Sequence, residues 1–126
     1  METETPILVK DVMSTPLKTI SARKTVREAA AQMRKHDINA LFVPGASAGI
    51  ITTTDVVEAV AEGMDPSEIE VADVITAPVE RITTAENLSE AAAMMINFDI
   101  KHLPVIDDDG DYVGVVSTTD LTTQLA

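Results

Sequence analysis

The sequence predicts a mixed α/β (α+β) fold made of two pseudo-symmetric β-α-β-β-α repeats that pack sheet to sheet. Three observations support this prediction. The chain has 126 residues, 45% of them hydrophobic, enough for one domain or two small ones with a real core. A long segment of the sequence occurs twice. Within each copy, apolar residues at helical spacing alternate with short runs typical of strands.

The internal repeat defines the domain organisation. A shift of 62 residues aligns Asp11–Pro16 with Asp73–Pro78 and Glu28–Ala31 with Glu90–Ala93. After a three-residue insertion, Gly49-Ile50-Ile51-Thr52-Thr53-Thr54-Asp55 corresponds to Gly114-Val115-Val116-Ser117-Thr118-Thr119-Asp120. We therefore expect repeat 1 over residues 8–62, a linker over 63–69 and repeat 2 over 70–126. A repeat of this size has a small core, so the two should pack against each other.

In repeat 1, a short strand is expected at Leu17–Ile20. Thr25 and Glu28 form a capping box that begins the first helix. The buried face of that helix recurs at helical spacing: Val26, Ala29, Ala30 and Met33. The remaining elements are strands Leu41–Val43 and Gly49–Thr52, a tight connection at Pro44-Gly45, and a helix over Thr54–Ala61.

In repeat 2, Asn87 caps the first helix. Strands are expected at Leu103–Ile106 and Tyr112–Ser117, joined by a hairpin turn over Asp107–Asp111. Met33, Met94 and Met95 lie at helical spacing and are interpreted as packing residues. The linker is marked by Gly63–Ser67, which contains Pro66.

Composition excludes several classes of function. Nine basic and 21 acidic residues give a formal net charge of −12, which repels nucleic acid. The aromatic residues are Phe42, Phe98 and Tyr112, too few for stacking on single strands. The chain has no cysteine, no apolar run long enough to span a membrane, and no signal peptide in Met1–Thr5, so a cytoplasmic location is expected. The acidity is typical of proteins from salt-loving organisms, and an ordinary acidic protein is the alternative.

The repeated motifs resemble the CBS domain, and the chain resembles a free-standing tandem pair, or Bateman module, over about residues 8 to 126. The resemblance rests on the Asp11–Pro16 opening, on Ile100-Lys101-His102-Leu103-Pro104-Val105, and on the twofold Gly-h-h-[Thr/Ser]-x-x-Asp string, where h is hydrophobic. It implies a regulatory module, not an enzyme, that senses an adenosine-containing ligand: AMP, ADP, ATP, S-adenosylmethionine or NAD. No obligatory cofactor and no membrane or nucleic-acid partner is implied.

The resemblance also implies two clefts built crosswise from the repeats, in which each aspartate accepts ribose hydroxyl groups. One cleft combines Thr52, Asp55, Ile75, Pro78, Glu80, Ile100, Lys101 and His102. The other combines Ser117, Asp120, Met13, Pro16, Lys18, Ile38, Asn39 and Ala40. Lys101 and His102 occupy positions that often contact phosphate in the family, so a phosphorylated ligand is expected in the cleft with Asp55. Surface exposure without a ligand is the alternative for this pair.

Other interpretations of these residues remain open. Thr52 with Asp55, and Ser117 with Asp120, also fit capping boxes. No arginine stands beside Asp55 or Asp120, because Thr54 and Thr119 occupy those places, and this favours an alternative function as an interaction or structural protein with vestigial clefts. No metal site is expected, because an EF-hand alignment of Asp107–Asp111 places Val105 and Val116 at ligand positions. The alanine-rich helices imply a homodimer shaped as a four-repeat disc.

Overall fold

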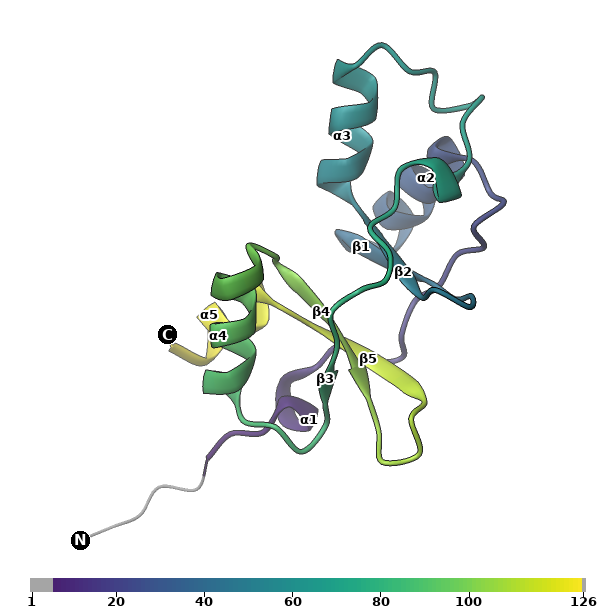
Figure 1. Ribbon diagram of the computed structural model, residues 1–126. Coiled ribbons are helices and arrows are strands. Elements are labelled where there is room, and N and C mark those ends of the chain that lie inside the picture. The colour runs from purple at the N-terminus through teal and green to yellow at the C-terminus, as the bar shows by residue number, and fades with distance from the viewer. Residues whose placement is uncertain (1–5, 126) are drawn as a thin grey trace, which may run out of the picture. The chain divides into compact units, whose positions relative to one another are not determined.

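The computed structural model describes residues 6–125, which form two compact units. Unit 1 contains the chain up to Leu17 and from Glu80 onward, and unit 2 contains Lys18–Val79. The expectation about Met1–Thr5 lies outside the described residues. Each unit has its own small sheet with helices beside it (Figure 1). The predicted mixed α/β class is thereby confirmed.

Unit 2 is built on an antiparallel pair of strands. Its elements are α2 (Val26–His36), β1 (Ala40–Val43), β2 (Gly49–Thr52), α3 (Thr53–Ala61) and the short 3₁₀ helix η1 (Val71–Asp73). Ala40 lies opposite Thr52 in the β1–β2 register. The predicted capping box is confirmed, because Thr25 N donates to Glu28 Oε2 at 2.8 Å and Glu28 N donates to Thr25 Oγ1 at 3.1 Å.

The strand predicted at Leu17–Ile20 is wrong. This segment makes a single parallel bridge, between Thr19 and Phe42, and does not continue along β1. Ile20 is its only fully buried residue, so the segment lacks the alternating apolar face that would extend the pairing. Ile20 instead joins the unit 2 core, which comprises Ile20, Val26, Ala29, Met33, Leu41, Val43, Ile51 and Val71.

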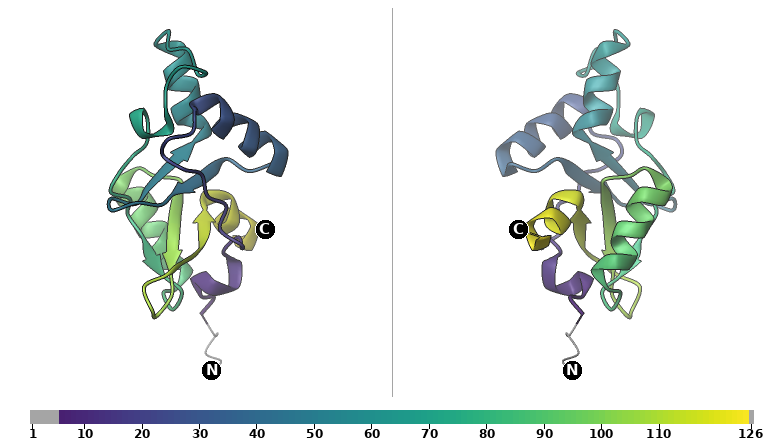
Figure 2. Two further views of the ribbon diagram at one scale, coloured as in Figure 1. Left: turned by 90° about the vertical axis from the view of Figure 1, so that its right-hand side faces the viewer. Right: turned by 90° about the vertical axis from the view of Figure 1, so that its left-hand side faces the viewer.

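Unit 1 contains a three-stranded sheet in the order β3-β4-β5. Its elements are α1 (Val9–Val12), β3 (Ile82–Thr83), α4 (Leu88–Phe98), β4 (His102–Ile106), β5 (Tyr112–Ser117) and α5 (Thr118–Leu125). Strand β3 is parallel to β4, and β4 and β5 form the predicted antiparallel hairpin. Helices α4 and α5 lie side by side next to the sheet (Figures 1 and 2). The predicted Asn87 cap is confirmed, since its Oδ1 accepts from Glu90 N at 3.0 Å.

The methionines predicted to be packing residues are in the two cores. Met33 and Met95 are buried, and Met94 packs against the core of unit 1. That core comprises Val9, Ile82, Ala91, Met95, Leu103, Val105 and Val116. No helix among residues 6–125 is long and apolar enough to cross a membrane.

The opening segment of each repeat packs within the unit that holds the other repeat's strands. In unit 1, Ser14 pairs with Val115 of β5, with N–O distances of 2.8 and 3.2 Å. In unit 2, Thr76 pairs with Ile50 of β2 at 3.3 and 3.2 Å. The compact units therefore divide the chain differently from the sequence repeats, because the openings are exchanged.

Candidate functional site

The motif of repeat 1 places Asp55 at the start of α3. Thr52 ends β2 and is the N-cap of the helix, so its backbone N and Oγ1 donate to Asp55 Oδ2 at 2.8 and 3.1 Å. Asp55 N in turn donates to Thr52 Oγ1 at 3.4 Å. The capping interpretation is therefore correct for this pair.

The motif of repeat 2 has the same geometry in unit 1. Ser117 N and Oγ donate to Asp120 Oδ2 at 2.7 and 3.0 Å, and Asp120 N donates to Ser117 Oγ at 3.2 Å. Both aspartates are half-buried. The cap thus fixes each carboxylate in one orientation at the N-terminus of a helix.

Each cap uses only one of the two carboxylate oxygens. Among residues 6–125, every hydrogen bond to these side chains ends on Oδ2 of Asp55 or of Asp120. Among the described residues of each unit, no hydrogen bond ends on Oδ1 of either aspartate. A fixed, half-buried carboxylate oxygen of this kind is suited to accept hydrogen bonds from a ligand's hydroxyl groups. The capping role and a ligand-binding role are therefore compatible in one residue.

Backbone contacts fix the residues around each aspartate. Thr53 N donates to Asn39 O, and Thr118 N donates to Lys101 O, both at 3.0 Å. The segment leading into β1 therefore adjoins the start of α3, and the segment leading into β4 adjoins the start of α5. The opening segment of repeat 2 packs closely against Gly49. A β-carbon added at Gly49 would lie 2.8 Å from Ile75 Cδ1 and 3.1 Å from Thr76 O.

The predicted site residues divide equally between the two units. Unit 2 holds Thr52, Asp55, Ile75, Pro78, Lys18, Ile38, Asn39 and Ala40. Unit 1 holds Ser117, Asp120, Met13, Pro16, Glu80, Ile100, Lys101 and His102. Ala40 is buried, whereas Lys18, Asn39, Glu80 and Lys101 are exposed. The crosswise combination of the two sets stays a prediction.

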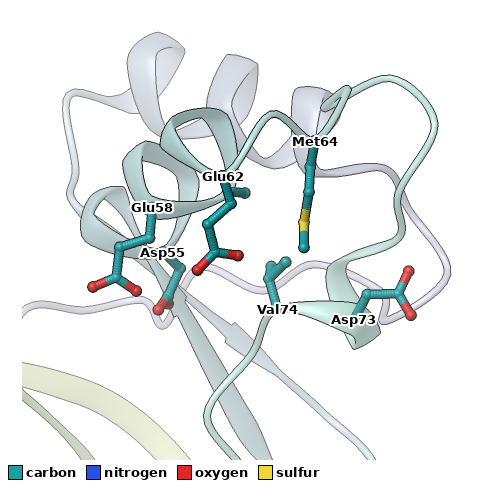
Figure 3. A pocket seen from close by; sticks show the side chains of 7 residues that line it. Asp55, Glu58, Glu62, Met64, Asp73 and Val74 are labelled. Atoms are coloured by element: carbon teal, nitrogen blue, oxygen red, sulfur yellow. The ribbon is translucent and has the colours of Figure 1, made fainter.

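A pocket of about 160 Å³ adjoins Asp55 within unit 2 (Figure 3). Its lining residues are Asp55, Glu58, Ala59, Glu62, Met64, Asp73 and Val74. Asp55 and Glu58 lie on α3 and Glu62 is the C-cap of that helix. The Met64 side chain points toward Val74 (Figure 3). Glu58, Glu62 and Asp73 are not among the residues predicted from the sequence. Glu58 and Glu62 follow Asp55 at helical spacing, so the sequence could have predicted that these three carboxylates lie on one side of a helix.

The aspartates of the β4–β5 hairpin form a second acidic group. Carboxylate oxygens of Asp107, Asp109 and Asp111 lie within 4.8 Å of one another. Asp107 Oδ1 accepts from Asp109 N at 2.9 Å and from Asp111 N at 3.0 Å, and Gly110 takes the positive φ of 83° that closes the turn. These contacts account for the predicted hairpin as a tight turn.

The CBS domain family matches this chain over residues 9–62 and 71–126. The CBS domain-containing protein YhcV of Bacillus subtilis is 31% identical over 116 residues, which cover 90% of this chain and 81% of YhcV. Two other relatives are longer. The chain spans 61% of protein MK0525 from Methanopyrus kandleri and 24% of a homoserine O-acetyltransferase from Methanocorpusculum labreanum, at 30% and 35% identity.

Solved structures show the same fold. The CBS domain pair of protein MJ0100, in complex with 5′-methylthioadenosine and S-adenosyl-L-methionine, has a TM-score of 0.87 and 29% identity, covering 96% of this chain and 97% of that one. The CBS domain protein PAE2072 from Pyrobaculum aerophilum, complexed with AMP, has a TM-score of 0.82 and 22% identity, covering 91% and 90%.

Proposed function

Because the chain belongs to the CBS domain family and carries two such domains, we propose that it is a regulatory module that binds an adenosine-containing ligand through Asp55 and Asp120. The observation that carries this proposal is the divided use of each carboxylate. Oδ2 accepts the cap hydrogen bonds, and Oδ1 is left for the two hydroxyl groups of a ribose. The MJ0100 pair, 29% identical and bound to two adenosine compounds, supports the ligand class.

The charges near Asp55 determine which adenosine ligands suit it. Glu58 and Glu62 line the pocket beside Asp55 and oppose a phosphate there. Lys101 is the cation that the crosswise arrangement assigns to this ligand, and His102 is next to it in the sequence. We therefore propose that a phosphorylated ligand depends on Lys101, whereas an uncharged adenosine compound does not.

Regulation requires that the ligand favours one state of the protein over another. We propose that the relevant state is that of a homodimer. Val57 and Val60 on α3 are 66% and 54% exposed, and Ile96 and Phe98 on α4 are 79% and 50% exposed. Apolar side chains on helix surfaces of a small protein favour association with a second copy. Light scattering at micromolar concentration tests this, and a stable mass near 13.4 kDa contradicts it.

An interaction module with vestigial clefts is the second candidate function. Thr54 and Thr119 stand directly before the two aspartates, where an arginine would supply a cation, so neither motif carries its own cation for phosphate. A thermal-shift panel distinguishes the two functions. It compares AMP, ATP, S-adenosylmethionine, 5′-methylthioadenosine and NAD, with guanosine as the matched control nucleoside.

The proposed function predicts stabilisation by at least one adenosine compound and none by guanosine. A ligand present at 100 times its dissociation constant adds about 2.7 kcal/mol to the free energy of unfolding. If none of the five compounds raises the melting temperature, the interaction module is the better description.

A further inference from the structure

Basic residues are concentrated in one segment of this acidic protein. Six of its nine Lys and Arg residues lie between positions 18 and 35: Lys18, Arg23, Lys24, Arg27, Arg34 and Lys35. All six are exposed. Three of them, Arg27, Arg34 and Lys35, lie on α2, and the other three precede it in the sequence. Glu28 is the only acidic residue in that range. The segment therefore has the opposite charge to the chain as a whole.

The repeated scaffold does not require these charges. At the shift of 62 residues, α4 carries Ser89, Ile96 and Asn97 where α2 carries Arg27, Arg34 and Lys35. The two helices otherwise keep the same buried face, with Ala29 and Met33 matched by Ala91 and Met95. The basic residues thus belong to the surface of one repeat and not to its fold.

Local electrostatics accounts for only part of the cluster. Cations in the last turn of a helix interact favourably with the helix dipole, and this accounts for the positions of Arg34 and Lys35. Arg23 and Arg27 lie at the opposite end, where the dipole disfavours them. Within residues 6–125, the one ion pair formed by a Lys or Arg joins Lys24 Nζ to Glu28 Oε1 at 4.0 Å.

The spacing of these residues places several of them on one surface. Arg27 and Arg34 are seven residues apart on α2, and Lys35 is one position further, so all three lie outside the buried side formed by Val26, Ala29 and Met33. We call Arg27, Arg34 and Lys35 the basic face of α2. Among the described residues, none of these three forms an ion pair within 4.0 Å, although Arg27 interacts with the Asp65 carboxylate at longer range.

The densest run of acidic residues in the sequence lies in the β4–β5 hairpin of unit 1. This hairpin carries four aspartates in the five residues Asp107–Asp111, and three of them are exposed. The turn holds the carboxylate oxygens of Asp107, Asp109 and Asp111 within 4.8 Å of one another, an arrangement that a nearby cation stabilises. Unit 1 has twelve acidic and three basic residues, and unit 2 has nine and six, so the net charges are −9 and −3.

We propose that the basic face of α2 docks on the Asp107–Asp111 hairpin of a second copy of this chain. Charge complementarity selects this occupant, because the chain itself carries the matching acidic surface. In a two-fold pair the contact is made twice, once in each direction. Contact between two basic faces or between two hairpins would instead oppose like charges. The inference rests on the proposed homodimer and names a contact within it.

The test is a charge-reversal series measured by sedimentation equilibrium, in buffer with EDTA to remove bridging metal ions. Arg34→Glu and Asp109→Lys should each weaken dimerisation by at least about tenfold, because each opposes like charges across the contact. The double variant Arg34→Glu/Asp109→Lys should return to within about threefold of the unmodified protein. Lys10→Glu, an equal charge change on exposed Lys10 of α1, is the matched control and should leave dimerisation within about threefold.

Several outcomes overturn the contact, and they differ from failure of the dimer. A dimer that Arg34→Glu and Lys10→Glu affect equally shows that the contact is wrong while the dimer stands. A double variant weaker than either single one also overturns it. Dimerisation that does not weaken between about 0.1 M and 1 M KCl excludes charge as its basis. A monomer under all conditions overturns both the contact and the homodimer.

Discussion

The carbonyl oxygen of Ser14 lies 2.8 Å from the position that a β-carbon on Gly114 would occupy. The sulfur of Met13 would lie 3.0 Å from the same atom. Strand β5 therefore accepts the opening segment of repeat 1 only because residue 114 has no side chain. The conformational freedom of glycine is not what matters here, since Gly114 does not have a positive φ.

Replacing Gly114 tests this packing. Gly114→Ala should lower the free energy of unfolding by about 1–3 kcal/mol, because the obstructing atom is backbone and cannot move alone. Gly49→Ala should cost less, since its closest neighbour is the flexible tip of Ile75. Urea denaturation measures both. Gly45→Ala is the control, with nothing within 4 Å of its β-carbon, and equal effects at positions 45 and 114 contradict the packing account.

The acidic pocket beside Asp55 gives a prediction about ligand charge. Glu62→Gln should strengthen AMP binding by about two- to fivefold, because it removes a charge that repels phosphate at a partly exposed site. Binding of uncharged 5′-methylthioadenosine should not change. Glu68→Gln, an exposed glutamate of the same unit outside the pocket, is the control. AMP binding is measured by calorimetry. If Glu62→Gln and Glu68→Gln bind AMP with the same affinity, the pocket charge has no role.

The proposed role of Lys101 is tested separately. Lys101→Ala should weaken AMP binding by about tenfold, the usual value of a charge-assisted hydrogen bond, and leave 5′-methylthioadenosine binding unchanged. Combining Lys101→Ala with Asp55→Asn distinguishes a shared ligand from two separate ones. Effects on AMP affinity that simply add in free energy argue against the crosswise arrangement.

Salt should raise the stability of the fold. The 21 carboxylates repel one another across the surface, and molar KCl screens this repulsion over a few ångströms. We expect a higher melting temperature in about 1 M KCl than in dilute buffer. A melting temperature that is constant or falls as KCl is added contradicts the saline interpretation of the composition.

Features that are fixed by contacts between residues close in the sequence could be predicted from the sequence. Thr25 with Glu28, and Asn87 with Glu90, cap helices through contacts three residues apart, so the pattern alone reveals them. The error at Leu17–Ile20 has a tertiary cause. This segment pairs with β1 only at Thr19 and Phe42, and residues so far apart in the sequence give no local pattern from which the extent of pairing could be predicted.

The candidate site was predictable to a similar extent. The two capped aspartates follow from the repeated motif, and Glu58 follows Asp55 on the same helix. The exchanged openings could not be predicted, because Asp11–Pro16 and Asp73–Pro78 have nearly the same pattern and either could pack on either repeat. Asp73 therefore reaches the Asp55 pocket through a contact that only the fold reveals.

The measurement that tests the central claim most directly is calorimetric binding of 5′-methylthioadenosine to the Asp55→Asn/Asp120→Asn variant. Asparagine retains one oxygen that accepts the cap hydrogen bonds and replaces the other carboxylate oxygen with a donor. We predict that the variant keeps its melting temperature within a few degrees and loses at least about tenfold in affinity, since hydrogen bonds to a charged group contribute about 1.5–3 kcal/mol. Unchanged affinity in the folded variant would show that neither aspartate binds the ribose.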